Sequence, residues 1–232
     1  MGDQGCGLVG KVVAPGDAVQ ALPASGSVRI GPGLRAEGSY VVAQKCGVVR
    51  QTRNGKLWLE SKQKRYIPAE EDLVVGTITD RRGENFVVDI GAPFPAQLPM
   101  LSFEGATRRN RPNLVAGDLV YARVITANRD MDPVLTCVDA QGKSSGFGAL
   151  KGGFVLECGL GHARALLARP PAPLLAALGA KLQFELAVGL NGRVWLDSSS
   201  CATTVKVANV LQQAQGVAAA EVQQWVAAQL QQ

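Results

Sequence analysis

Apolar and polar residues alternate over many short stretches of this chain, which is the two-residue period of β-strands. In residues 85–90, for example, Phe86, Val88 and Ile90 fall on one face, while Val87 and Asp89 fall on the other. Turn signals built from Gly, Pro and Asn separate these stretches, and the 232 residues include 27 Gly and 12 Pro. The helical spacing of apolar residues is found in the C-terminal third. The pattern predicts a mainly β chain with a C-terminal α+β domain.

Residues 7–71 form the first predicted domain, a small all-β unit. Strands are expected within residues 11–17 and at 27–30, 39–44, 47–51 and 57–60. Asn54-Gly55 is the strongest hairpin signal in the chain, because both residue types accept the positive φ angles of a tight turn. Basic residues crowd the end of this segment, where RNA, an acidic partner or plain solvent would each suit them. They are Arg50, Arg53, Lys56, Lys62, Lys64 and Arg65.

Residues 73–140 form the second predicted domain. Strands are expected at 73–79, 85–90, 96–98, 118–127 and 134–138. Five strands with a long excursion between the third and the fourth fit a five-stranded Greek-key barrel of the OB type. Such barrels bind single-stranded nucleic acid with one face and with the loops at its rim.

Residues 147–232 form the third predicted domain, which contains both strands and helices. The expected strands are 154–158, 184–188 and 193–197, and the expected helices are 161–168, 173–178 and one that includes 207–214. The order β-α-α-β-β-α is that of a KH domain. A final helix places Val222, Val226 and Leu230 on one face with Trp225 beside it, which suits core packing or docking to a partner.

The predicted loops of the barrel are rich in arginine. Residues 101–118 read LSFEGATRRNRPNLVAGD, and two other loops of the barrel also carry arginine. Guanidinium groups keep their charge, pair with phosphate oxygens and stack on bases, so three such loops on one barrel predict an RNA-binding rim. The loop at 101–118 alone is explained equally well as a solvated charged loop. The candidate RNA-binding residues are Arg81, Arg82, Arg108, Arg109, Asn110, Arg111 and Arg129, with Phe86 as a stacking aromatic or a core residue.

The net charge, the cysteine and histidine content and the absence of long apolar runs limit the kinds of ligand and location that we expect. The formal net charge is +5 with a pI near 9.1, a mild basic bias that is compatible with RNA. Five well-separated cysteines and a single histidine, His162, argue for a reducing compartment and against a zinc site. No apolar run has the length of a membrane span, and the first residues lack a signal-peptide core. We expect no metal, cofactor, membrane or small-molecule substrate.

Two other functions compete with an RNA-binding scaffold. Asp130 and Asp132, with Glu104 on a neighbouring loop, would be the metal ligands of a hydrolase, but Asp132-Pro133 also has the chemistry of a turn. A free-standing RNA-binding protein acting in translation or RNA metabolism would use the same barrel. The absence of a Gly/Ser linker between the three segments favours a rigid three-domain chain over a barrel on a tether.

Several longer motifs resemble a known family. They are Val13-Ala-Pro-Gly-Asp17, Gly31-Pro-Gly-Leu34, Val75-Gly-Thr-Ile78, the SFEGATRRNRPN run at 102–113, Gly117-Asp-Leu119 and Gly189-Leu-Asn-Gly-Arg-Val-Trp195. In this order, over residues 12–213, the chain resembles the RNA exosome cap subunits, which combine an N-terminal β domain, an S1 domain and a KH domain. The resemblance implies non-catalytic work on a ring of six RNase PH-like subunits, beside other cap subunits.

The same resemblance implies that the subunit stabilises this ring and lines the entry for single-stranded RNA, which is processed or degraded from its 3′ end. It also implies a location in the nucleus, nucleolus and cytoplasm. Gly189, Asn191 and Gly192 match the GxNG motif of the family, which shapes the contact between the S1 and KH domains. Trp195 is expected in the core or at that contact.

An RNA-clamping KH domain needs a GxxG loop between its first two helices, where the backbone approaches phosphates closely. Here the junction reads Ala168-Arg-Pro-Pro-Ala-Pro173, and its prolines remove amide donors. The sequence therefore predicts a KH domain with a structural role.

Overall fold

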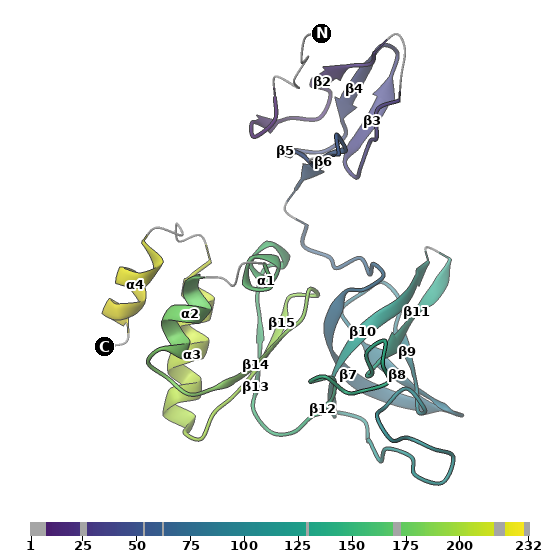
Figure 1. The fold of residues 1–232 in the computed structure, drawn as a ribbon, viewed down its shortest axis with the longest axis vertical. Helices are drawn as coiled ribbons and strands as arrows, with labels where there is room; N and C mark the ends of the chain where they lie inside the picture. The colour runs from purple at the N-terminus through teal and green to yellow at the C-terminus, as the bar shows by residue number, and fades with distance from the viewer. Residues whose placement is uncertain are drawn as a thin grey trace. The chain divides into compact units, whose positions relative to one another are not determined.

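The computed structural model of the chain describes residues 8–23, 27–52, 54–61, 63–128, 130–168, 173–215 and 221–229. The chain divides into two compact units, Met1–Gln63 and Lys64–Gln232. Strands dominate the first unit and the barrel of the second, and the helices of the described residues all follow the barrel (Figure 1). The fold class predicted from the sequence, mainly β with a C-terminal α+β domain, is confirmed.

Two three-stranded antiparallel sheets make up the first unit. One sheet has the order β1-β5-β6, with β1 at Val12–Val13, β5 at Gly47–Gln51 and β6 at Leu57–Glu60. The other has the order β2-β4-β3, with β2 at Ala18–Ala21, β4 at Tyr40–Ala43 and β3 at Leu34–Glu37. Their core includes Val41, Val49 and Leu57, which are fully buried.

The strand pairing of this unit confirms one prediction and corrects another. β5 and β6 pair through Gln51 and Leu57, and Gly55 takes a φ of +76° in the turn between them, as the Asn-Gly signal requires. The strand expected at 27–30 is wrong, because only Ile30 forms an isolated bridge, with Leu57. β2 and β3 were not predicted. Each has four residues and a single buried one, so the sequence pattern of a half-buried strand is too short to stand out.

A closed barrel begins the second unit, with its five strands in the predicted order. They are β7 (Leu73–Arg82), β8 (Asn85–Asp89), β9 (Ala96–Pro99), β10 (Leu119–Asn128) and β11 (Met131–Thr136). The sheet runs β11-β9-β8-β7-β10-β12, where β12 is a sixth strand at Gly148–Leu150, and an additional antiparallel pairing of β10 with β11 closes it. An S1/OB-like barrel is therefore confirmed.

Phe86 lies in the centre of the barrel core. Its side chain is 0% exposed and packs with Val88 and Ile90, the residues that share its inward face. The ring of Phe103 meets it edge to face, with the centroids 6.3 Å apart. The assignment of Phe86 as an RNA-stacking aromatic is wrong, because a buried ring has no free face for a base. Instead, the Phe86–Phe103 contact anchors the start of the arginine-rich loop to the barrel.

A sixth strand, β12 (Gly148–Leu150), extends the barrel sheet. It pairs antiparallel with β10 from Leu119↔Leu150 to Tyr121↔Gly148. These residues were assigned to the third predicted domain, which began at residue 147. With three residues and no β-branched side chain, β12 carries no sequence signal of its own.

The KH domain follows with the predicted order of elements. They are β13 (Phe154–Glu157), α1 (Leu160–Leu166), α2 (Pro173–Gly179), β14 (Glu185–Val188), β15 (Arg193–Asp197) and α3 (Cys201–Gln213). The antiparallel sheet runs β13-β15-β14 and shares one core with the helices. A last helix, α4 (Val222–Gln229), buries Val222 and Val226 in the same core as Leu174 and Leu178 of α2.

Two sequence features of this domain fall outside the described residues. They are Leu230, expected on the face of the final helix, and most of the proline-rich junction, at 169–172. The longest described helix, α3, has 13 residues. In the described part of the chain, no helix has the length and hydropathy to span a membrane.

Candidate nucleic-acid interface

The tip of the β7–β8 hairpin carries Arg81 and Arg82. Both side chains are exposed, and Arg82 lies 3.5 Å from the carboxylate of Asp80. The same carboxyl group accepts the amide hydrogen of Arg81 at 2.7 Å. Asp80 therefore shapes the hairpin end while it offsets part of its positive charge.

The loop between β9 and β10 carries Arg108, Arg109 and Arg111, three further candidates for RNA binding. Its backbone turns at Thr107, whose amide donates to the carbonyl of Asn110 at 2.9 Å. The amide of Asn110 donates in return to Oγ1 of Thr107 at 3.0 Å, and its side chain donates to the carbonyl of Gly105. Asn110 is thus held as a turn residue, whereas Arg108 and Arg109 are exposed at the turn.

Arg111 joins this loop to the β7–β8 hairpin. Its Nη2 lies 3.2 Å from Oε1 of Glu84, and its Nε donates to the carbonyl of Arg108. The amide of Met100 also donates to the carbonyl of Glu84, at 3.0 Å. The structure therefore brings Arg111 to the hairpin that carries Arg81 and Arg82. Arg129, the remaining candidate, lies outside the described residues.

A polar chain of side chains crosses the neighbouring strands of the barrel. Asn85 on β8 donates to Oε1 of Gln97 on β9 at 3.1 Å, and Gln97 donates to Oδ2 of Asp132 on β11 at 3.1 Å. No sequence signal pointed to this connection, because the three residues are distant in the chain. It engages the carboxylate of Asp132.

The carboxylates of Glu104, Asp130 and Asp132, considered as metal ligands of a hydrolase, are not grouped around one point. Oε2 of Glu104 accepts the amide hydrogen of Ser144. Hydrogen bonding from the side chain and the amide of Ser144, with the nearby Lys143 charge, lowers the pKa of the carboxyl group. Among the described residues, no three His, Cys, Asp or Glu side chains are grouped so that they would hold a metal ion.

The GxNG motif lies between the barrel and the KH domain. Nδ2 of Asn191 donates to the carbonyls of Val75 (2.8 Å) and Ile90 (3.0 Å), and its Oδ1 accepts from the amide of Val75. The amide of Leu190 donates to the carbonyl of Leu73 at 2.7 Å. The motif thus binds the edge of β7 with both main chain and side chain.

Glycine is required at both ends of the motif. A Cβ on Gly189 would collide with Oδ1 of Asn191 and come within 2.7 Å of the Val75 amide. Gly192 has a φ of +80°, and a Cβ there would lie 2.6 Å from the carbonyl of Cys158. The missing side chain of Gly189 therefore allows the close approach of the two domains, and that of Gly192 allows close packing within the KH domain.

Two further contacts reinforce this domain contact. Arg193 donates to the Asp89 carbonyl at 2.8 Å and to its carboxylate at 2.7 Å. Burial alone would raise the pKa of the Asp89 carboxyl group, but hydrogen bonds from Arg193 and Gly91 and the Arg193 charge lower it overall. The hydroxyl of Tyr121 donates to the carbonyl of Val188 at 3.2 Å.

Trp195 is buried at the same contact, with 5% of its surface exposed. It packs with Val75 of the barrel and Ala187 of the KH domain, and its Nε1 donates to the carbonyl of Gly152 at 2.9 Å. The tryptophan is therefore an interdomain residue and has no free face for a base.

Family models match three consecutive parts of the chain. The model described as "Exosome complex exonuclease Rrp40 N-terminal domain" covers residues 28–65, and that described as "Exosome complex component RRP40, S1 domain" covers residues 66–148. A KH domain model covers residues 153–200. A crystal structure of a protein described as an exosome complex RNA-binding protein has the same fold, with a TM-score of 0.59 and 21% identity. The match covers 72% of this chain and 98% of that one.

Curated relatives match over most of the chain. The exosome complex component RRP40 of Drosophila melanogaster is 44% identical, covering 86% of this chain and 87% of its own. The human protein of that name is 39% identical, covering 85% and 77%. The Saccharomyces cerevisiae protein is 33% identical, covering 83% and 84%. With these identities over nearly the full length, and with the three domains in the order of the family, the chain belongs to the RRP40 (ribosomal RNA-processing protein 40) family of exosome complex components.

Proposed function

We propose that this chain is a non-catalytic, RNA-binding cap subunit of an RNA exosome. It stabilises the ring of RNase PH-like subunits, beside other cap subunits, and guides single-stranded RNA towards the channel for 3′-to-5′ processing and decay. The observation that carries this proposal is the pair of exposed arginines, Arg108 and Arg109, on a loop that Arg111 fastens to the arginine-bearing hairpin. Membership of the RRP40 family supports the assembly.

The chemistry of this rim suits binding that is insensitive to base sequence. Arg81, Arg82, Arg108 and Arg109 present guanidinium groups to solvent, where they meet phosphates. With Phe86 and Trp195 buried, neither ring is free for stacking on bases. The rim would therefore hold the RNA backbone and let the strand slide, which is what threading into a channel requires.

The positions of the Glu104, Asp130 and Asp132 carboxylates fit a non-catalytic role. Glu104 is bound to the Ser144 amide and Asp132 to Gln97, so these two do not converge with Asp130 on one ion. As a cap subunit, the protein would be found in the nucleus, nucleolus and cytoplasm. Fluorescent tagging of the chain in cells tests this location.

RNA binding by the reconstituted complex tests the rim. Replacing Arg108, Arg109 and Arg111 by Ala should weaken the binding of a single-stranded oligonucleotide and flatten its salt dependence. The slope of log affinity against log salt should fall by about 0.7 for each phosphate that the variant no longer neutralises. A control with Arg35, Arg50 and Lys181 replaced by Ala removes three exposed cations elsewhere. Equal slopes for the two variants would reject the rim.

Assembly is tested separately. Size-exclusion chromatography of the chain with ring and cap subunits should show co-elution. A chain that binds RNA but never joins the ring would instead be a free-standing S1-type RNA-binding protein.

A further inference from the structure

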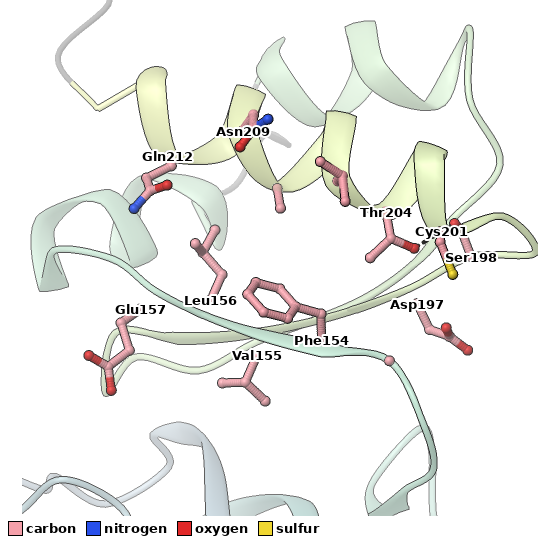
Figure 2. Close-up of a pocket in the computed structure, with 13 residues that line it drawn as sticks. Phe154, Val155, Leu156, Glu157, Asp197, Ser198, Cys201, Thr204, Asn209 and Gln212 are labelled. Atoms are coloured by element: carbon pink, nitrogen blue, oxygen red, sulfur yellow. Dashed lines mark hydrogen bonds between the residues drawn. The ribbon is translucent and has the colours of Figure 1, made fainter.

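A groove of about 580 Å³ lies between the strand β13 and the helix α3 of the KH domain (Figure 2). Figure 2 shows Phe154 and Leu156 pointing towards α3, while Val155 points to the opposite side of the sheet. Phe154 and Val205, which face the groove from the strand and from the helix, are 51% and 57% exposed. None of these residues belongs to the arginine rim, so the proposed function leaves the groove unexplained.

The strand beside the groove has a free edge. In the described part of the chain, β13 lies at the edge of its sheet and pairs only with β15. The amide of Cys158 donates to the carbonyl of Gly192 on the β15 side. Because alternate residues of an antiparallel strand point to opposite edges, the N–H and C=O groups of Val155 and Glu157 point outwards. Such an edge accepts an additional strand.

The charge around the groove has one sign. Glu157 and Asp197 are the charged residues that line it, and no Lys or Arg does so. No ion pair involves either carboxylate among the residues that the structure describes. A phosphate backbone would be repelled here, whereas Lys or Arg side chains would be attracted.

We propose that the β13 edge and α3 form a docking groove for an extended, basic peptide segment of another protein. The segment adds a strand to β13 and forms main-chain hydrogen bonds with Val155 and Glu157. Every second side chain of the segment is apolar and enters the groove between Phe154 and Val205. The intervening Lys or Arg side chains lie near Glu157 and Asp197. This inference stands apart from RNA binding, because it uses neither the rim arginines nor the GxNG motif.

The probe is a short fluorescein-labelled peptide of alternating Val and Lys residues, tested against the full chain by fluorescence anisotropy. Matched peptides replace Lys by Glu, or carry N-methylated backbone amides that remove the main-chain donors. The Val–Lys peptide should bind, with an affinity that falls as salt rises, and the two matched peptides should not. Equal binding of the Val–Glu peptide, or no binding of the Val–Lys peptide, would overturn the proposal.

Variants then locate the site. Val205→Glu should weaken binding of the Val–Lys peptide by about tenfold or more, because it places a charge among the apolar contacts. Glu157→Gln should weaken it less and reduce its salt dependence. Phe94→Ser is the control, since Phe94 is 55% exposed on the barrel and outside the groove. A thermal melt shows that each variant is folded. Equal loss of affinity in Val205→Glu and Phe94→Ser would reject this site.

Cys201 provides a direct readout, because its exposed thiol lines the groove. Maleimide labelling of Cys201, mapped by mass spectrometry, should slow when the Val–Lys peptide is bound, while labelling of the exposed Cys46 should not change. Protection of Cys201 by single-stranded RNA in place of the peptide would overturn the proposal. So would a dimer of the chain, seen by sedimentation, that Val205→Glu dissociates, because a second copy would then occupy the groove.

Discussion

Asn191 satisfies both backbone groups of Val75, a residue 116 positions earlier in the chain. Its Nδ2 donates to the carbonyl at 2.8 Å and its Oδ1 accepts from the amide at 3.3 Å. The side-chain amide therefore pairs with β7 much as a neighbouring strand would. One residue of the KH domain thus completes the hydrogen bonding of the barrel edge.

Replacing Asn191 by Asp tests this relationship. The substitution removes the donors to Val75 and Ile90 and leaves two carbonyls and a negative charge in a buried position. We expect the free energy of unfolding to fall by about 2–4 kcal/mol, measured by urea titration. Asn209→Asp, at an exposed position on α3, should change it little. A similar loss in both variants would contradict the role given to Asn191.

Gly192 and Gly142 allow the cost of a close contact to be measured apart from the cost of a positive φ angle. Gly192 and Gly142 have φ angles of +80° and +78°, but only at Gly192 would a Cβ meet other atoms, 2.6 Å from the Cys158 carbonyl. Replacement by Ala should cost about 1 kcal/mol at Gly142, from the backbone alone, and about 1–3 kcal/mol more at Gly192. Thermal or urea unfolding measures both. Equal costs would mean that the contact around Gly192 relaxes freely.

Glu84 should limit RNA binding by Arg111. The pair is solvent-exposed, so its removal changes stability little, but it holds Arg111 away from phosphates. Glu84→Gln should raise the affinity of the assembled complex for single-stranded RNA by about two- to fivefold at low salt. Glu37→Gln, which frees Arg35 in the first unit, is the matched control. Unchanged affinity in Glu84→Gln would show that Arg111 serves only to hold the loop.

His162 should make the fold sensitive to mild acid. Its Nε2 is buried with no partner in the described part of the chain, and burial lowers the pKa of the imidazole below its usual value near 6.5. Below that value the unfolded chain takes up a proton that the folded chain resists, so stability should decline as pH falls from about 6.5. Urea midpoints at several pH values measure this decline.

The variant His162→Gln supplies the control for that experiment. His162 is the single histidine of the chain, so its replacement should flatten the decline in stability. An unchanged pH dependence would assign the effect to another group.

The barrel and the KH domain could be predicted from sequence because their strands and helices carry clear periods and turn signals. The position of Arg108 and Arg109 on an exposed loop followed from those elements, whereas Arg81 and Arg82, expected in the hairpin loop, are the exposed last residues of β7. Which residues of a strand are buried was harder to predict from the sequence. Phe86, Val87 and Val88 are all buried, with at most 8% of their surface exposed, so alternation did not reveal which face of β8 is covered.

Contacts between residues that are distant in the chain could not be predicted from the sequence pattern. Nothing in the run at 101–118 indicates that Arg111 pairs with Glu84, or that Phe103 packs on Phe86. The role of Asn191 followed from the family resemblance, since a lone Asn between two glycines reads equally well as a turn residue. Its partners on β7 became clear only from the three-dimensional fold.

The strand β12 limits how far the barrel and the KH domain can move relative to each other. It joins the barrel sheet at Tyr121 and Leu119, and only three residues, Lys151 to Gly153, separate it from β13. Trp195 donates a hydrogen bond to the carbonyl of Gly152 in this short link. The KH domain therefore has little room to swivel, and any assembly that holds it also sets the direction in which the arginines face.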